Sequence, residues 1–492
     1  MTIISRKKKR NNCGSMRSTK LLLTFTFCMI AMFYLPYKYM IQEGSIDDKI
    51  IKNKQHMPIV QPMITEHQTP PKLNNNDEKP TSTPNYHTVF STDCSGYQHW
   101  QSYLLFYSAY KVKQPGTVTR IASGCTKEEQ EAERAFQSQI SDQMSSNFKV
   151  HFTPQFSKVK GEGEEGDGET YKFFNKPFGL LHWIEHAEVK IKDDDIVILL
   201  DPDQVLTRPI TNDFSNQSEN TLVGQNPKTI VTHGSPFAQE FGFGASWRNL
   251  DIDAVTGTND SPAKSVTEQD AIDHYPAGPP YLATTKDMHA IARTWSDFVP
   301  RSYKIFPELM AEMYAFCIAV AHLKMPHQIV KSLMVSDVDV EDGEGWNFVE
   351  AIEDEKICSP AAMGYSTLPS VLHYCQRYVL GKHIFGKHKM PLDTFSCDAP
   401  LLAIPPEDIA ERYDYWIDPN LVDGKREYLT KIEVKKTAFM ICFLTHHANE
   451  ASKFYKSRNC KSSEVSAAPL KIIDLWSGKT STSSTKKEKG EY

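Results

Sequence analysis

The sequence predicts an α/β fold in which helices cover both faces of a mostly parallel sheet. Between residues 87 and 200, short runs rich in β-branched residues alternate with longer stretches of helical periodicity. The run Ile-Val-Ile-Leu-Leu at 196–200 is apolar at every position, as expected of a strand that is buried on both faces. Strands and helices that alternate in this way favour a doubly wound sheet.

The composition is that of a globular protein that does not bind nucleic acid. A chain of 492 residues can bury one large core or two ordinary ones, and 40% of this chain is hydrophobic. The net charge of −6 is spread along the chain, and the one basic cluster, at 6–10, is confined to the extreme N-terminus. We therefore expect no nucleic-acid partner.

The cysteines indicate disulfides rather than a zinc ribbon. None of the ten forms a Cys-x-x-Cys pair. Cys94 and Cys125 are close enough in the sequence to be the simplest candidate pair, provided that the chain enters an oxidising compartment. For Cys317, which lies in an apolar helical stretch, a buried reduced thiol is the alternative.

The N-terminal region predicts a single membrane anchor followed by a stem. Residues 1–20 are polar and basic, which predicts a cytoplasmic tail, and residues 21–37 contain no charge. A cleaved signal peptide is the alternative, but bulky tyrosines stand where small residues would be needed for cleavage. Residues 38–86 are rich in proline and predict a disordered stem. This is the architecture of a type II protein of the Golgi or endoplasmic reticulum membrane, with its folded domain in the lumen.

The folded region is predicted to begin with strands at 87–92, 117–123 and 148–152, separated by helices around Trp100 and at 127–140. A helix at 175–187 then leads to the apolar strand at 196–200. Asp201 and Asp203 follow that strand, with Pro202 between them. Because open α/β sheets bind ligands at the carboxyl ends of their strands, these carboxylates could hold Mg²⁺ or Mn²⁺ and so neutralise a diphosphate. The alternative is a solvated acidic turn.

The second half of the chain holds further candidates. Residues 215–276 read as loops, and helices are predicted at 287–298 and 308–323, the latter carrying Glu312. A like-charge pair of Glu308 and Glu312 is unfavourable unless a cation or substrate lies opposite, although a solvated helix edge is the plainer interpretation. A short strand at 371–374 carries His373, which is either a third metal ligand or an ordinary histidine. Helices at 408–416 and 431–447 form an extension at 401–476, and 477–492 predicts a disordered tail.

Motifs along this region resemble those of one known group. They are, in order, His-Thr-Val-Phe-Ser at 87–91, Trp-Gln at 100–101, Pro-Gly at 115–116, Thr-Arg at 119–120, Asn-Lys-Pro-Phe at 175–178, Trp-Ile-Glu at 183–185, Asp-Pro-Asp-Gln-Val at 201–205, Arg-Pro-Ile at 208–210, Gly-Pro-Pro at 278–280, Trp295, Glu-Met-Tyr-Ala at 312–315 and His-Tyr at 373–374. Their order resembles that of the plant-type peptidyl glycosyltransferases. That group contains the hydroxyproline O-arabinosyltransferases and the peptidyl-serine α-galactosyltransferases.

The resemblance implies a GT-A-like catalytic domain at 87–400, a UDP-sugar donor and Mn²⁺ or Mg²⁺ as cofactor. Asp201, Asp203 and His373 are implied as the metal ligands, and Glu312 and Asp203 as the catalytic residues. The implied UDP-sugar-binding residues are Thr92 and Arg120 near the uridine, Lys176, Asp201, and Lys382 or Lys387 at the diphosphate.

The expected function is transfer of galactose or arabinofuranose from a UDP-sugar to a hydroxyl of serine or hydroxyproline in a peptide or glycoprotein. The group implies retention of the anomeric configuration. Asp201 stands where the arabinosyltransferases often carry glutamate, and the segment after His373 also lies nearer the serine-galactosyl side, so the donor sugar stays open. Two other functions fit the same residues. One is a Golgi transferase of the same fold that acts on glycans, and the other is a non-catalytic lumenal lectin or scaffold.

Overall fold

The computed structural model describes residues 84–158, 170–188, 190–359, 368–418, 425–461 and 470–483. The predicted cytoplasmic tail, the anchor and all but the last residues of the stem lie outside these ranges and stay predictions. Among the helices that the structure describes, none combines the length and the apolar character needed to cross a bilayer.

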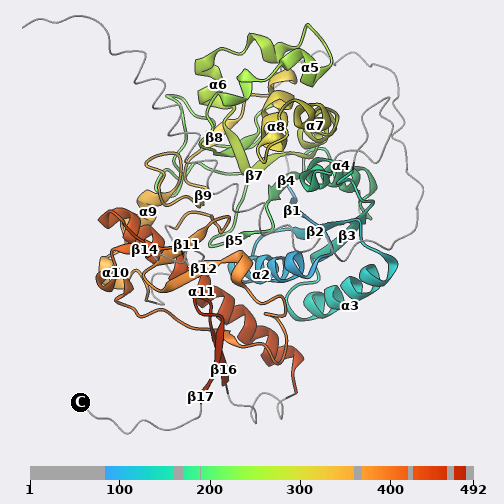
Figure 1. Cartoon of the computed structure of the whole chain (residues 1–492). Coiled ribbons are helices and arrows are strands. Elements are labelled where there is room, and N and C mark those ends of the chain that lie inside the picture. Colours follow the sequence, from blue (N-terminus) through green and yellow to red (C-terminus); the bar gives the residue numbers. More distant parts are fainter. Residues whose placement is uncertain are drawn as a thin grey trace, which may run out of the picture. The chain divides into compact units, whose positions relative to one another are not determined.

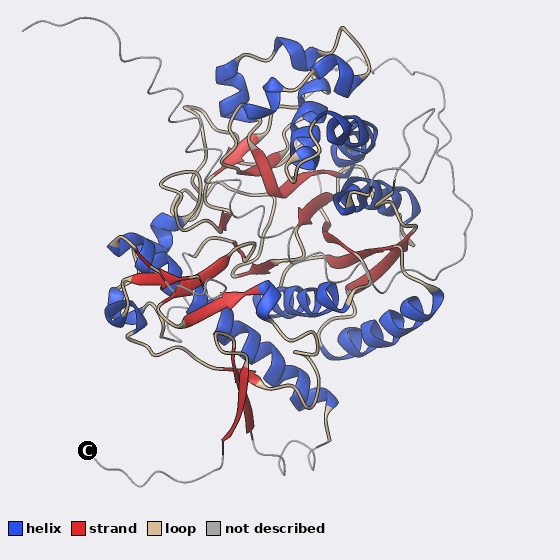
Figure 2. Ribbon diagram, in the orientation of Figure 1, coloured by secondary structure: helices blue, strands red, loops and turns tan. Residues whose placement is uncertain are grey.

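A seven-stranded sheet forms the centre of the fold (Figures 1 and 2). Its strands, in spatial order, are β3 (Phe148–Thr153), β2 (Thr117–Ser123), β1 (Tyr86–Thr92), β4 (Ile196–Leu200), β7 (Ala277–Thr284), β6 (Phe237–Glu240) and β8 (Gln328–Val330). Only β7 runs antiparallel to its neighbours in this sheet. The prediction of a mostly parallel α/β sheet is therefore confirmed.

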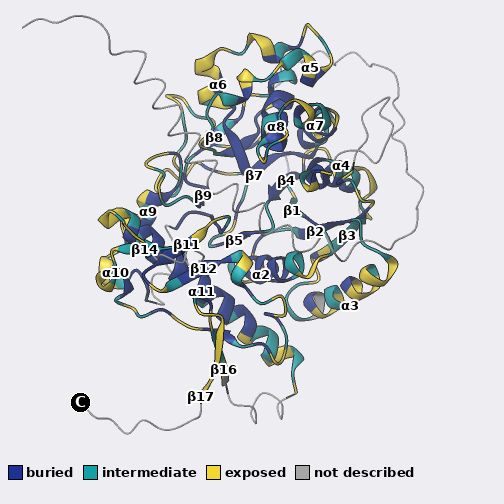
Figure 3. Ribbon diagram, viewed as in Figure 1, coloured by how far each residue is buried: buried dark blue, intermediate teal, exposed yellow. Residues whose placement is uncertain are grey.

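Two apolar layers sandwich the sheet, and β4 shows why. Ile196, Ile198 and Leu200 belong to one core cluster, and the alternate residues Val197 and Leu199 belong to the other. Because successive side chains of a strand point to opposite faces, a run that is apolar at every position needs a cover on both sides. Figure 3 shows the central strands in dark blue, buried between these layers.

Helices from different parts of the chain supply the two covers. On one side, α2 (Gly96–Val112) and the long α11 (Lys431–Asn459) contribute to the first cluster. On the other side, α4 (Asn175–His186), α7 (Thr285–Ile305) and α8 (Ala311–His322) contribute to the second. The polar α3 (Lys127–Gln143) lies largely exposed and begins with a capping box of Thr126 and Glu129.

A small second sheet lies beside the carboxyl end of β4 and brings distant segments together. Its strands are β5 (Gln204–Leu206), β10 (Val371–His373) and β9 (Met334–Val335), with β10 in the middle. β10 pairs antiparallel with β5 so that His373 faces Gln204. The hairpin of β11 (Arg377–Leu380) and β12 (His383–Gly386) follows directly. This arrangement carries His373 and Lys387 back to the acidic turn.

Two regions differ from their predictions. Residues 215–276, predicted as loops, contain β6, α5 (Ile252–Thr256) and α6 (Glu268–His274). These elements were missed because each is too short to show a periodic pattern. The predicted helix at 408–416 is limited to α10 (Ile409–Arg412), and the chain then enters the strand β14 (Tyr415–Ile417), which pairs with β15 (Arg426–Tyr428).

The C-terminal part also departs from the helical extension and disordered tail that the sequence predicted. α11 runs twelve residues past the predicted end at His447, to Asn459. β13 (Leu401–Leu402), β16 (Leu470–Asp474) and β17 (Lys479–Ser483) form a small sheet. The polar segment 479–483 is a strand because its backbone pairs antiparallel with the neighbouring β16 in a hairpin, which its own composition does not reveal.

Three disulfides tie the described residues together. Cys94 is bonded to Cys125, as predicted, and two further bonds join Cys358 to Cys442 and Cys397 to Cys460. The last two fasten α11 to the segments that precede it. Cys317 is a free, buried thiol, which confirms the alternative of a reduced thiol in an apolar helix.

Candidate active site

Two carboxylates stand where the buried strand β4 ends. Asp201 follows Leu200 directly, and Asp203 lies two residues further on, at the start of β5. The backbone N–H of Asp201 donates to the side chain of Gln204 at 3.0 Å, which fixes the turn between the two strands. Asp203 is buried and Asp201 is partly buried. This placement argues against a freely solvated acidic turn.

His373 meets these carboxylates because β10 pairs with β5. Its Nε2 atom lies 3.2 Å from Oδ1 of Asp203, and the imidazole is buried. The backbone N–H of Tyr374 donates to the carbonyl of Asp203 at 3.0 Å and holds the two chains in register. Ligand atoms of Asp201, Asp203 and His373 all lie within 4.8 Å of one another. The structure therefore assembles the three predicted metal ligands into one group.

Two lysines neutralise the two carboxylates. Nζ of Lys387, just after β12, lies 2.6 Å from Oδ2 of Asp203. Nζ of Lys176, in the first turn of α4, lies 2.7 Å from Oδ1 of Asp201 and 3.4 Å from Oε1 of Glu312. All of these side chains are largely buried. A buried charge without a partner is costly, and here each carboxylate has an ammonium beside it.

Glu312 is linked to this group through Lys176, which contacts both Glu312 and Asp201. It lies in the first turn of α8, where its backbone N–H donates to the hydroxyl of Tyr171 at 3.2 Å. The indole N–H of Trp295 donates to the carbonyl of Glu312 at 2.9 Å. Burial raises the pKa of the Glu312 carboxyl to about 7, with the ammonium of Lys176 opposing the rise and the charge of Asp201 adding to it. A carboxyl with this pKa can exchange a proton near neutral pH.

The pKa values of Asp203 and His373 are shifted in opposite directions, and both shifts favour the charged form. Burial alone would raise the pKa of Asp203, but the charges of Lys387 and His373 outweigh burial and hold this pKa well below its usual value. Burial opposes charge on His373 as well, yet the neighbouring Cys375 and Asp203 raise the pKa of its imidazole. The group is thus arranged to keep Asp203 ionised.

The residues present fit a divalent cation. Two carboxylates and one imidazole are a donor set suited to Mn²⁺ or Mg²⁺. Oδ1 of Asp201 is buried and accepts no hydrogen bond of good geometry within the described residues, although the ammonium of Lys176 lies close to it. A buried carboxylate oxygen of this kind is able to accept a metal ion. Which ion the group prefers is part of the proposal below.

Comparison with known proteins agrees with this geometry. The family model described as the hydroxyproline O-arabinosyltransferase family N-terminal domain matches residues 86–329. Residues 86–329 belong to the plant peptidyl glycosyltransferase group. The peptidyl serine alpha-galactosyltransferase of Arabidopsis thaliana is 29% identical over 177 residues, which are 33% of this chain and 19% of that protein. The chain thus matches only about a fifth of the length of that relative.

Solved structures with some similarity are also glycosyltransferases. The galactosyltransferase LgtC, solved with donor and acceptor sugar analogues, covers 59% of this chain and 87% of its own at 12% identity and a TM-score of 0.31. The glycosyltransferase GlyE of Streptococcus pneumoniae TIGR4 covers 60% of this chain and 55% of its own at 13% identity and a TM-score of 0.27. These similarities are low.

The site extends beyond the residues that the family model matches. Asp201, Asp203 and Glu312 lie within residues 86–329, whereas His373 and Lys387 lie after it. β10 and the β11–β12 hairpin supply these two residues. The segment that follows the matched domain is therefore needed to complete the group.

Lys382 does not lie in this site. It is exposed in the turn between β11 and β12, whereas Lys387 lies beyond the other end of β12. Four residues of extended strand separate the two ends by about 13 Å. Of the two lysines predicted at a diphosphate, only Lys387 reaches the carboxylates.

Arg120 and Thr92, which were predicted to lie near the uridine, bond to each other and to neighbouring protein groups. Nε of Arg120 donates to the hydroxyl of Thr92 at 2.9 Å, and its Nη atoms donate to Glu133 at 2.7 Å and to the carbonyl of Asp93 at 2.9 Å. The guanidinium is buried and is already used by protein groups. Arg120 therefore holds the end of β1 in place, and its position near a uridine stays a prediction.

Two residues of the site had not been predicted. Gln204 is fully buried, accepts from the N–H of Asp201 and donates to the carbonyl of Pro279 at 3.3 Å. Its signal in the sequence was a polar residue at the start of the otherwise apolar strand β5. Tyr171 bonds to both the N–H of Glu312 and the carbonyl of Leu309, and no local pattern marks it.

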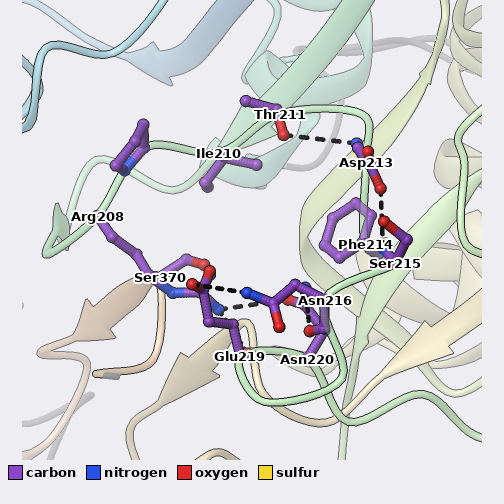
Figure 4. Close-up of a pocket in the computed structure, with 11 residues that line it drawn as sticks. Arg208, Ile210, Thr211, Asp213, Phe214, Ser215, Asn216, Glu219, Asn220 and Ser370 are labelled. Carbon is purple, nitrogen blue, oxygen red and sulfur yellow. Dashed lines mark hydrogen bonds and ion pairs between the residues drawn. The ribbon is translucent and has the colours of Figure 1, made fainter. Parts of the chain in front are cut away.

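A separate cavity of about 300 Å³ lies beside the segment that follows β5 (Figure 4). Arg208 lines it, but this guanidinium donates to the carbonyl of Leu368 at 2.9 Å and to the carbonyl of Glu219 at 2.8 Å. These bonds hold two loops together, so the guanidinium is not free to bind a phosphate. The cavity contains none of the carboxylates of the candidate site.

Proposed function

We propose that the chain is a metal-dependent, GT-A-like glycosyltransferase that moves a sugar from a UDP-sugar to a hydroxyl of serine or hydroxyproline in a peptide. One observation carries the proposal: carboxylates from the end of β4, an imidazole from β10 and a lysine after β12 meet at one edge of the sheet. That edge is where open α/β sheets bind ligands. The family to which residues 86–329 belong supports this reaction class.

The chemistry at the donor is charge stabilisation. Breaking the bond between sugar and phosphate develops negative charge on the departing UDP, and Mn²⁺ or Mg²⁺ bound to Asp201, Asp203 and His373 would supply positive charge there. Lys387 lies beside the same carboxylates and can pair with the diphosphate of the donor. Both contributions act on the leaving group.

Glu312 is our candidate for the group that acts at the sugar. Lys176 bridges it to Asp201, which places its carboxylate next to the metal-binding group. We propose a retaining reaction, in which Glu312 either stabilises front-face attack or acts as the nucleophile. In both roles the carboxylate must be ionised, which Lys176 favours. Glu312→Gln should therefore lose transfer activity but keep UDP affinity.

The compartment that we propose is the Golgi or the endoplasmic reticulum. The uncharged run at 21–37 would anchor the chain with its folded part in the lumen. Three disulfides within the described residues are consistent with an oxidising compartment. For the donor we favour UDP-galactose or UDP-arabinofuranose, because the matching family is named for arabinosyl transfer and the Arabidopsis relative for galactosyl transfer.

A panel of UDP-sugars tests the proposal. The full-length protein, purified in detergent, is incubated with Mn²⁺ and each of UDP-galactose, UDP-arabinofuranose, UDP-glucose and UDP-N-acetylglucosamine. UDP release is measured with serine-rich peptides, hydroxyproline-rich peptides or glycans as acceptors. We expect release with one donor that depends on peptide and stops on chelation of the metal. Release that responds to glycans only would favour a Golgi transferase acting on glycans. The absence of both UDP binding and UDP release would favour a non-catalytic lectin or scaffold.

A further inference from the structure

We propose that Lys387 is an exchangeable counter-ion: it pairs with Asp203 and must leave this carboxylate when a divalent cation binds there, which makes the cation and the donor diphosphate bind cooperatively. The inference rests on the proposed function, because it assumes that both ligands use this site. It adds a thermodynamic coupling between them that the donor set alone does not require.

The first observation is that both oxygens of Asp203 are already engaged. Oδ2 accepts from Nζ of Lys387 at 2.6 Å, and Oδ1 lies 3.2 Å from Nε2 of His373. The side chains of Lys387 and Asp203 are only 15% and 11% exposed. A cation that binds Asp203 must therefore compete with the ammonium of Lys387. Because both side chains are largely buried, water solvates neither charge well when the pair separates.

The second observation is that the two lysines of the site are not equivalent. Lys176 has two carboxylate partners, Asp201 and Glu312, so it keeps one when the other binds a cation. Within the described residues, the ion pair of Lys387 is with Asp203 alone. Displacing Lys387 therefore leaves a largely buried ammonium without a counter-ion, which is costly until an anion arrives.

The third step concerns the charge that each ligand brings. A divalent cation alone adds two positive charges to a buried cluster, and the diphosphate of a nucleotide sugar alone adds two negative charges. Bound together, they leave the total charge unchanged. The displaced Lys387 then finds its new partner in the diphosphate. Both effects favour joint binding, and Lys387 strengthens the coupling because it penalises the cation that binds without nucleotide.

The coupling is measured as the effect of UDP on Mn²⁺ affinity. Free Mn²⁺ is counted by electron paramagnetic resonance during titration of the full-length protein, with and without saturating UDP, for wild type, Lys387→Met and Lys387→Gln. In the wild type, UDP should tighten Mn²⁺ binding by about 10–100-fold. In both variants, we expect Mn²⁺ without UDP to bind about tenfold tighter, and the effect of UDP to shrink by about the same factor.

Lys382→Met is the matched control, because Lys382 is an exposed lysine of the same hairpin. It should leave Mn²⁺ affinity and the effect of UDP unchanged. Lys387→Gln keeps a hydrogen-bond donor for Asp203 and covers the case in which Lys387→Met fails to fold. Unchanged Mn²⁺ affinity in folded Lys387 variants would overturn this inference and leave the proposed function standing. Failure of the wild type to bind either Mn²⁺ or UDP would refute both.

Discussion

Nε2 of His373 lies 3.2 Å from Oδ1 of Asp203, although the two residues are 170 positions apart in the chain. Their approach depends on the pairing of β10 with β5, which places His373 opposite Gln204. Lys387 reaches the other oxygen of Asp203 through the hairpin that follows β10. The candidate site is thus built by one small sheet that returns the C-terminal segment to the end of β4.

Removal of Asp203 should abolish metal-dependent transfer. Asp203→Ala removes a proposed metal ligand that also pairs with His373 and Lys387. Asp201 is then the remaining carboxylate of the turn. Because even groups outside the metal's own ligands cost 10–100-fold when removed, we expect UDP release to fall by at least about 100-fold. Circular dichroism must show a folded variant. Undiminished activity in folded Asp203→Ala would contradict the metal role.

Glu312 should make the protein less stable as pH rises. Its pKa is near the ordinary value of 4.5 in the unfolded chain and about 7 in the folded chain, so the folded state binds the proton more tightly. Between pH 4.5 and 7, this preference is lost, and the free energy of unfolding should fall by on the order of 3 kcal/mol relative to Glu312→Gln. Urea denaturation at several pH values with EDTA measures the difference. Parallel pH curves for wild type and variant would show that the shift is absent.

Arg120 should contribute to stability much more than to UDP binding. Arg120→Met removes the 2.7 Å partner of the buried Glu133 and leaves it only His99, at 3.0 Å. Breaking a buried ion pair typically costs about 3–5 kcal/mol, and we expect a loss near the lower end because His99 remains. The double variant Arg120→Met/Glu133→Met should recover part of this loss, because the buried carboxylate that lost its guanidinium partner is removed as well. Unfolding by urea gives the first quantity, and UDP titration gives the second. A loss of UDP affinity above about 100-fold with unchanged stability would instead support the uridine contact that the sequence suggested.

The bond between Cys358 and Cys442 should stabilise the C-terminal part of the chain. It joins residues 84 positions apart and fastens α11 to the preceding segment. Loss of a disulfide that closes a loop of this length typically costs about 2–5 kcal/mol. Cys358→Ser, Cys442→Ser and the double variant should lose similar amounts, since each removes the same bond. Additive losses in the double variant would indicate that the thiols contribute separately.

Local patterns in the sequence were enough for the parts of the fold that local forces decide. The strand at 196–200 was predicted with its exact bounds because an apolar run has to be buried on both faces. The turn that places Asp201 and Asp203 followed from the end of that strand. The bond between Cys94 and Cys125 followed from short sequence separation.

Contacts between elements decided what the local patterns left open. Lys382 and Lys387 could not be distinguished without knowing that they lie at opposite ends of β12. Arg120 lies in β2, and one of its buried contacts is with Glu133 of the helix α3, which the pattern of the strand alone does not reveal. β17 is polar and has no strand signature of its own, and it forms because β16 is beside it. In each case, the deciding partner is distant or has no local signal.

The central claim is that the end of β4 holds the ion that binds the donor diphosphate, and anomalous diffraction tests it most directly. Crystals of the protein grown with Mn²⁺ and UDP would be measured at a wavelength at which manganese scatters anomalously. We expect one strong peak within about 2.5 Å of Asp203 and His373, with the diphosphate on its other side. Bound UDP with the manganese peak elsewhere, or with no peak near these residues, would contradict the account.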